Sequence, residues 1–201
     1  VNSIQPALLA LIRRWGAIPV DLGLARDTEE DVRQRLATPC DLIVSIGGAS
    51  VGDYDVVRSA FAAEGFKPIF EKVAIKPGKP VWFSAKAATL VLGLPGNPAA
   101  AMVTSQLFLR PLIDALAGLA PSPQPPQRAC TTTPLPKAGN REEYLRAILT
   151  LGADGRATVQ AAEKQDSSLL SPFLTANALI RRPPNTPPAA AGDLVDIVML
   201  R

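Results

Sequence analysis

Two hydrophobic periodicities alternate along the first 118 residues, and this alternation restricts the fold more than any other feature of the sequence. Apolar residues at helical spacing from Ile4 to Trp15 predict a first helix, and Gly16 is a typical stop signal. The continuous apolar run 41–46 predicts a buried strand. Strands that alternate with helices are typical of a mostly parallel sheet covered on both faces. We therefore expect a three-layer α/β domain over residues 1–118.

Caps, glycines and prolines set the limits of the other elements in this domain. Residues 17–22 predict a short strand. Asp27 and Thr28 are candidate N-caps of a helix that runs to about residue 37, with Glu30 and Asp31 as capping-box partners. Further along, we expect a helix over 55–64, strands near 69–75, 80–84 and 89–93, and a helix from Asn97-Pro98 to about residue 116 with a bend at Pro111.

A proline-rich segment, 119–127, predicts a linker to a region with a different periodicity. Short apolar runs separated by turns follow it, so residues 128–201 are expected to form a small β-rich domain. A short helix is expected near 168–176, and Asp166 and Ser167 are interpreted as its caps. The runs expected as strands are 144–149, 157–160 and 194–198.

Composition excludes several classes of chemistry. The chain has no histidine, which excludes histidine-dependent triads, histidine bases and histidine metal ligands. Cys40 and Cys130 are most simply buried apolar side chains, so we expect neither a disulfide nor a zinc site. A net charge of +3 from 21 basic and 18 acidic residues does not indicate nucleic-acid binding. No apolar run approaches the roughly 18 residues of a membrane span, and we expect a cytoplasmic protein.

The loop 47–55, which follows the buried strand, carries both glycines and carboxylates. Gly47 and Gly48 allow a tight turn and a close approach of the backbone to a ligand. Asp53 and Asp55 suit a metal ion or the N–H groups of a ligand. The simpler alternative is a tight loop in which one of the two aspartates caps the next helix.

Two further loops contain groups that suit an anion. Lys76 and Lys79 lie in the sequence Lys-Pro-Gly-Lys-Pro, whose prolines are expected to hold both ammonium groups on one side. The alternative is a solvated hairpin tip. The loop 95–98 opens a helix whose first N–H groups favour an anion, unless it is only a well-formed turn with Asn97 as cap. Because ligands bind at the carboxyl ends of such strands, we expect the three loops at one sheet edge.

The motifs "GGASVGDYD", "AIKPGKP" and "GLPGNP", in this order and spacing, resemble those of the molybdopterin molybdenumtransferase family, which includes MoeA and the C-terminal part of gephyrin. "NSIQPALLALIRRWGA" and "LGLARD" fit the same domain of this family. "REEYLRA", "QDSSLLSPFLTANALI" and "GDLVDIVML" resemble its C-terminal β domain. The match covers nearly the whole chain. It implies a MogA-like molybdopterin-binding domain followed by a β-barrel-like domain.

The resemblance implies a transferase for the last step of molybdenum cofactor synthesis. In this step adenylylated molybdopterin is cleaved, molybdate is inserted at the dithiolene and AMP leaves, with a divalent cation such as Mg²⁺. Asp27 and Asp55 match acidic residues of the family's site and are expected to act in catalysis and in metal binding. The expected assembly is a homodimer, with the adenylyltransferase of the preceding step as a further partner. The residues implied to bind the substrates are Gly47, Gly48, Ser50, Gly52, Asp53, Lys76, Lys79, Pro95, Gly96, Asn97 and Pro98.

The sequence also departs from the family pattern. Family members have two further N-terminal domains, and their nucleotide-type domain begins with a strand and a Thr-Gly-Asp-Glu loop. Here residue 1 lies just before the first helix, so we expect a truncated chain, or one piece of a split protein, that has no turnover by itself.

Two other functions stay open. A non-enzymatic scaffold would dimerise through the first domain and hold a peptide in the β domain, but it has no need for carboxylates and lysines at one sheet edge. A molybdopterin adenylyltransferase would be expected to contain a loop closer to Gly-Gly-Thr-Gly, which this sequence does not have.

Overall fold

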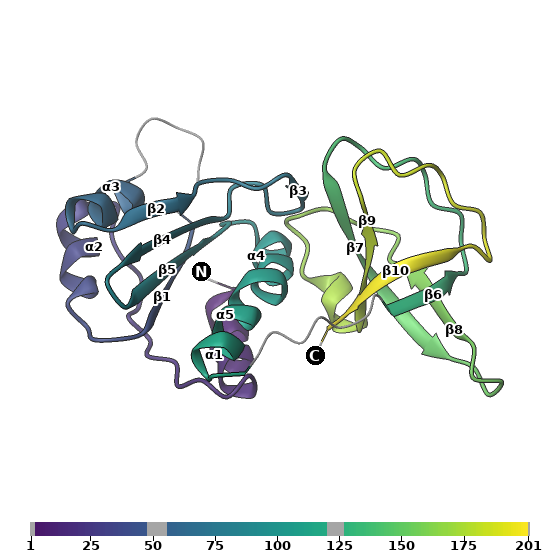
Figure 1. Ribbon diagram of the computed structural model, residues 1–201, viewed down its shortest axis with the longest axis horizontal. Helices are drawn as coiled ribbons and strands as arrows, with labels where there is room; N and C mark the ends of the chain where they lie inside the picture. The colour runs from purple at the N-terminus through teal and green to yellow at the C-terminus, as the bar shows by residue number, and fades with distance from the viewer. Residues whose placement is uncertain (1–2, 48–55, 120–126, 201) are drawn as a thin grey trace. The chain divides into compact units, whose positions relative to one another are not determined.

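The computed structural model describes residues 3–47, 56–119 and 127–200. The chain divides into two compact units (Figure 1). The first consists of Val1–Val73 and Gly78–Pro121, and the second of Ala74–Pro77 and Ser122–Arg201. The short segment Ala74–Pro77 thus belongs with the second unit, although the sequence alone places it inside the first domain.

The first unit is an α/β structure, as the alternating periodicities predict. Its helices are α1 (Gln5–Arg14), α2 (Glu29–Leu36), α3 (Val56–Ala63), α4 (Pro98–Thr104) and α5 (Arg110–Leu116). Its strands are β1 (Leu42–Ile46), β2 (Lys67–Phe70), β4 (Trp82–Lys86) and β5 (Thr89–Leu94), which pair in the order β1-β5-β4-β2.

The sheet of the first unit is mixed, which corrects the expectation of a mostly parallel sheet. β1 and β5 are parallel, with Leu42 opposite Leu90, whereas β4 is antiparallel to both β5 and β2. The reason is local. Only Ala87 and Ala88 connect β4 to β5, and so short a link joins antiparallel neighbours, because a parallel pair needs a long crossover.

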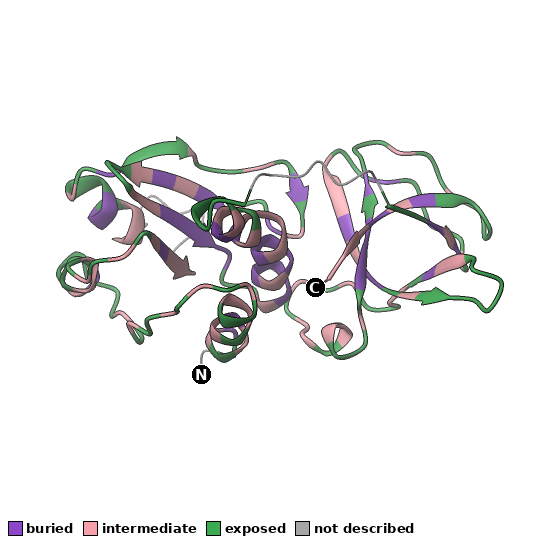
Figure 2. Cartoon of the chain, turned by 60° about the horizontal axis from the view of Figure 1, so that its bottom comes forward, coloured by how far each residue is buried: buried purple, intermediate pink, exposed green. Residues whose placement is uncertain are grey.

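Helices cover both faces of this sheet. Trp82 and Phe83 are neighbours on β4 and therefore point to opposite faces. The ring of Trp82 lies 5.6 Å from that of Phe61 on α3. Phe83 stacks on Phe70, which contacts Phe108, in the helical segment after α4, at 6.0 Å. Buried residues gather on the central strands and on α4 (Figure 2), so the three-layer arrangement is confirmed.

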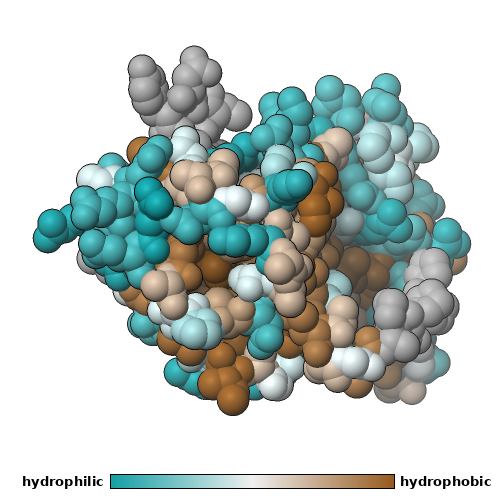
Figure 3. Space-filling model, turned by 60° about the vertical axis from the view of Figure 1, so that its left-hand side comes forward, coloured by the Kyte–Doolittle hydropathy of each residue, from teal (hydrophilic) through white to brown (hydrophobic). Residues whose placement is uncertain are grey.

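Residues 17–22 form no strand, contrary to the prediction. Ile18 is 93% exposed and Val20 is 59% exposed. Within the described residues β1 lies at one edge of the sheet and pairs with β5 alone. Residues 17–22 therefore do not pair with β1, and no other described strand of the sheet pairs with them. A strand needs such a neighbour for its backbone groups, and apolar alternation alone does not provide one. Figure 3 shows apolar side chains at the surface on the side of this unit that carries α2 and α3.

The long helix predicted after Asn97 is present as three successive segments. α4 begins at Pro98 with Asn97 as its N-cap residue, and a π-helical segment, Ser105–Leu109, separates it from α5. The N–H of Arg110 bonds to the carbonyl of Ser105, five residues back. Pro111 follows directly and has no N–H to donate, so the irregularity occurs where the sequence predicts a bend.

The second unit is a small β structure, as predicted. Its strands are β3 (Ile75–Lys76), β6 (Gln127–Thr131), β7 (Glu142–Leu151), β8 (Ala157–Ala161), β9 (Ala178–Arg182) and β10 (Leu194–Met199). They pair in the order β3-β7-β8-β6-β10-β9, and a further pairing of β7 with β9 closes a barrel. Val159 and Ile180 are fully buried in its core. The helix expected near 168–176 is shorter, a 3-10 turn at Ser171–Leu174.

Asp166 does not cap that turn, contrary to the interpretation from the sequence. Leu170 is the N-cap residue, and Asp166 Oδ1 instead accepts hydrogen bonds from the backbone N–H and the hydroxyl of Ser168. These two bonds lower the pKa of Asp166. The segment is attached to β7 by Arg146, which is fully buried and donates to the carbonyls of Lys164 and Asp166.

Candidate functional site

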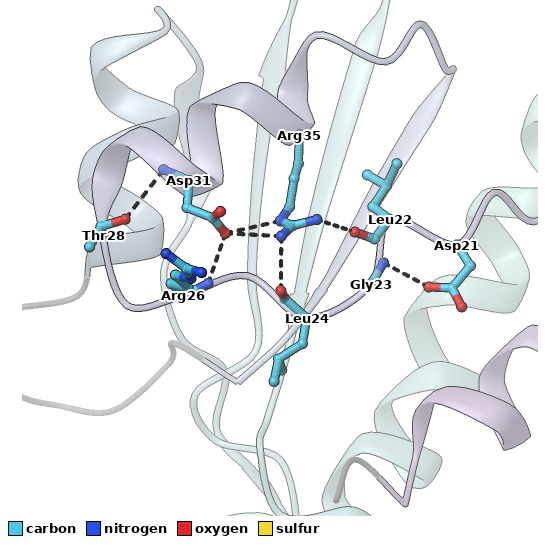
Figure 4. A network of polar contacts seen from close by, with 8 residues as sticks. All are labelled: Asp21, Leu22, Gly23, Leu24, Arg26, Thr28, Asp31 and Arg35. Carbon is cyan, nitrogen blue, oxygen red and sulfur yellow. Dashed lines mark hydrogen bonds and ion pairs between the residues drawn. The ribbon is translucent and has the colours of Figure 1, made fainter.

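The loop that leads to Asp27 is held in place by Arg35 of α2 (Figure 4). The guanidinium of Arg35 donates hydrogen bonds to the carbonyls of Leu22 and Leu24, the second at 2.9 Å. The same group lies 3.1 Å from the carboxylate of Asp31, one turn earlier on the helix. One side chain therefore holds two carbonyl groups of the irregular segment against α2.

Asp31 holds the same loop from the first turn of α2. Its Oδ2 accepts the N–H of Arg26 at 2.8 Å, and its own N–H is capped by Thr28 Oγ1 at 3.3 Å. The bond from Arg26 is the main cause that lowers the pKa of Asp31, and Arg35 adds to it. Thr28 is thus the N-cap that the sequence predicts. Asp27 lies between Arg26 and Thr28 and is exposed, so its carboxylate is presented to solvent from a braced backbone.

The carboxyl ends of β1 and β5 bring two of the predicted loops together. The N–H of Gly47 donates to the carbonyl of Leu94 at 3.0 Å. Gly47 has a φ of +83°, and a Cβ on Gly96 would lie 3.5 Å from the Cα of Gly47. The two backbones can run this close because neither residue has a side chain. In the rest of the proline loop, Pro95 is buried, Asn97 is exposed and Pro98 is half-buried.

The two lysines of the basic loop have different surroundings. Lys76 lies on β3 in the second unit, and its Nζ is 3.3 Å from Oε1 of Glu143 on β7. The carboxylate of Glu143 also accepts the N–H of Gly139. Lys79 belongs to the first unit, is exposed, and forms no ion pair with any residue that the structure describes. The charge of Lys76 is therefore partly balanced, whereas that of Lys79 is open to an anion.

Several predicted site residues cannot be placed. Gly48, Ser50, Gly52, Asp53 and Asp55 lie outside the described residues, so their roles stay predictions. Elsewhere, in residues 3–47, 56–119 and 127–200, no group of three or more Cys, Asp or Glu side chains could hold a metal ion. No helix in those ranges is long and apolar enough to cross a membrane.

A divalent cation does not require such a cluster. Mg²⁺ is commonly bound by one or two carboxylates together with substrate phosphates and water. The exposed carboxylate of Asp27 fits this mode of binding. The pairing of Asp27 with Asp55 at one ion stays a prediction.

Two features of the site were missed at the level of the sequence. Asp31 and Arg35 are four residues apart on a predicted helix, so their ion pair could be predicted from the sequence. The hydrogen bonds from Arg35 to the carbonyls of the preceding loop could not. Glu143 is 67 positions away from Lys76, and no local pattern connects them.

Family comparisons agree with this architecture. Residues 1–115 match a family model described as a probable molybdopterin binding domain, and residues 128–200 match the MoeA C-terminal region, domain IV. The first match alone covers more than half of the chain. The chain belongs to the MoeA-type molybdopterin molybdenumtransferase family.

Relatives in this family are longer than the chain. A molybdopterin molybdenumtransferase of Haemophilus influenzae is 34% identical over 182 residues, which cover 89% of this chain and 45% of the relative. Molybdopterin molybdenumtransferase 2 of Mycobacterium tuberculosis is 33% identical over 207 residues, 98% of this chain and 49% of the relative. The chain thus spans about half the length of these two relatives.

Solved structures share the fold. A molybdopterin biosynthesis MoeA protein from Pyrococcus horikosii aligns with a TM-score of 0.78 at 22% identity, over 98% of this chain and 47% of that one. A molybdenum cofactor biosynthesis protein from Pyrococcus furiosus aligns with a TM-score of 0.74 at 22% identity, over 99% of this chain and 65% of that one. The family's α/β domain followed by a β-barrel domain is therefore the fold of this chain.

Proposed function

We propose that this chain is the substrate-binding part of a molybdopterin molybdenumtransferase, which inserts molybdate into adenylylated molybdopterin and releases AMP. Membership of the family supports a place in molybdenum cofactor biosynthesis. The observation that carries the proposal is the close approach of Gly47 and Gly96, which leaves a side-chain-free backbone at the sheet edge where ligands of α/β proteins bind.

In this proposal the charged residues divide the work. Lys79 attracts the phosphate groups of the pterin nucleotide, because its ammonium group is exposed and has no carboxylate partner among the described residues. Lys76 lies in the second unit and is already paired with Glu143, so its part in phosphate binding stays a prediction from the sequence. Asp27 and Asp55 would hold Mg²⁺, which when bound neutralises phosphate charge and orients the leaving AMP. Gly47, Gly96 and the proline loop shape the edge against which the ligand lies.

Titration calorimetry with adenylylated molybdopterin tests this assignment. Lys79→Ala should weaken binding, and by a larger factor at low salt, because an interaction between exposed charges is screened by ions. Lys67→Ala is the matched control. Lys67 is also exposed, but it pairs with Ala85 at the opposite end of the sheet. The Lys67→Ala substitution should leave the affinity for adenylylated molybdopterin unchanged.

Asp55→Asn probes the acidic side of the site. The loss of a charged acceptor should weaken binding of adenylylated molybdopterin by roughly 1.5–3 kcal/mol. Alternatively, it should reduce the dependence of that binding on Mg²⁺. A protein that binds the nucleotide with equal affinity after both Lys79→Ala and Asp55→Asn has its site elsewhere. A folded protein that does not bind the nucleotide at all would favour the scaffold alternative.

A further inference from the structure

A cavity of about 250 Å³ lies between α3 and the strands β2 and β4 of the first unit. Its walls include Phe61, Phe66, Pro68 and Trp82. Phe61 meets Phe66 edge-on at 5.2 Å and Trp82 at 5.6 Å, so these walls are a packed aromatic cluster. The volume is below the roughly 300–1,000 Å³ of pockets that enclose a whole drug-sized ligand. The cavity therefore suits a single ring system.

One hydroxyl in the cavity wall has no hydrogen-bond partner among the described residues and keeps some access to solvent. Ser84 lines the cavity from β4 and is only 6% exposed. Across the described ranges, no hydrogen bond involves its Oγ. Because this hydroxyl is accessible from the cavity, water or a ligand can form a hydrogen bond with it. A ring nitrogen or carbonyl of a bound ligand could therefore replace water at Ser84 Oγ.

A guanidinium group lies beside the same cavity. Arg58, in the first turn of α3, lies 5.6 Å from the centre of the Trp82 ring and donates to the carbonyl of Glu71 at 3.1 Å. The indole in turn lies directly over Gly93 of β5, where a Cβ would come within 1.9 Å of Nε1. Arg58 and Trp82 therefore stack, and the guanidinium brings a positive charge to a cavity wall that also includes Glu71.

One residue of the cavity wall, Trp82, lies at the same end of the sheet as the proposed site. Trp82 pairs with Gly93, and Gly93 is three positions before Gly96. The cavity wall thus includes the first residue of β4, which lies beside the carboxyl end of β5, although no described residue of β1 or β5 lines the cavity. A ligand that lies along this edge has the aromatic cavity within the same unit.

We propose that this cavity binds the flat nitrogen heterocycle of an anionic ligand, namely the pterin or the adenine ring of the substrate. The ring packs against the aromatic walls, Ser84 Oγ hydrogen-bonds to a polar atom of the ring, and Arg58 faces an attached phosphate. The identity of the ligand rests on the proposed function, whereas the ring site itself rests on the cavity.

Binding of AMP and of neopterin, each measured separately, tests the proposal. The chain has two tryptophans, so Trp15→Phe leaves Trp82 as the only one and its emission reports on the cavity. Either probe should change this emission in a saturable way, with an affinity that calorimetry measures independently. A response to AMP alone assigns the adenine ring, and a response to neopterin alone assigns the pterin.

Two matched substitutions on α3 localise the ring. Ala62 lines the cavity and is exposed, whereas Ala63 is exposed but does not line it. Ala62→Leu should narrow the cavity and weaken binding of the responding probe, AMP or neopterin, at least about tenfold. Ala63→Leu should change the affinity for the same probe less than about twofold. Ser84→Ala should weaken binding about fivefold, the equivalent of one net hydrogen bond of about 1 kcal/mol.

The outcomes separate this proposal from the function proposed above. Loss of affinity in Ala62→Leu and Ser84→Ala, with none in Lys79→Ala, supports the ring site and removes the role of Lys79. The reverse pattern keeps the function and overturns the ring site. The ring site is also overturned when neither probe binds at millimolar concentration, or when Ala62→Leu and Ala63→Leu behave alike.

Discussion

Replacement of Gly93 by alanine should strongly destabilise the first unit. A Cβ at this position would lie 1.9 Å from Nε1, 2.0 Å from Cε2 and 2.5 Å from Cδ1 of Trp82. The indole cannot move aside freely, because Trp82 is 2% exposed and packs between β5, Phe61 and Arg58. Overpacking of a core costs about 1–3 kcal/mol, and expulsion of a tryptophan costs about 3–5 kcal/mol. We expect about 3 kcal/mol, a large share of the roughly 5–15 kcal/mol that stabilises a typical domain.

A double-mutant cycle isolates this clash. Trp15 and Trp82 both belong to the first unit, so tryptophan emission in a urea titration follows the unfolding of that unit. In a Trp82→Leu background, where Trp15 remains as the probe, Gly93→Ala should cost less than about 0.5 kcal/mol, because the obstructing ring is absent. An equal cost of Gly93→Ala in both backgrounds would refute the steric argument and point to a backbone requirement for glycine.

Two further predictions follow from the fold. Asp31→Asn should lower stability at neutral pH, and the gap to the unsubstituted protein should close as the pH falls below the usual carboxyl pKa near 3.8. The reason is that the pKa of Asp31 is lowered in the folded protein, so its stabilisation is present above that range and is lost on protonation; acid titrations of both proteins by circular dichroism measure it. The chain should also form a dimer or a larger species, because β1 has an open edge within the described residues, and a clean monomer by light scattering at micromolar concentration would contradict this.

Local patterns in the sequence were sufficient for most elements of the first unit. The apolar run 41–46 became β1, Thr28 caps α2, and the Asn97-Pro98 pair begins α4, because each signal acts within a few residues of the element it defines. The motif glycines were also recognised from the sequence alone. The approach of Gly47 to Gly96 at one sheet edge was expected from the alternation of strands and helices.

Long-range pairing decided what the sequence left open. The run expected as one strand over 69–75 is divided, since β2 pairs with β4 in the first unit while Ile75–Lys76 pairs with β7 in the second. The apolar alternation of 17–22 does not make a strand without a neighbour beside it. The partner of Lys76 and the buried position of Arg146 likewise depend on residues that are distant in the chain. Such contacts exist only after the strands have paired, because hydrogen-bond partners and burial are properties of the packed structure and not of any short segment.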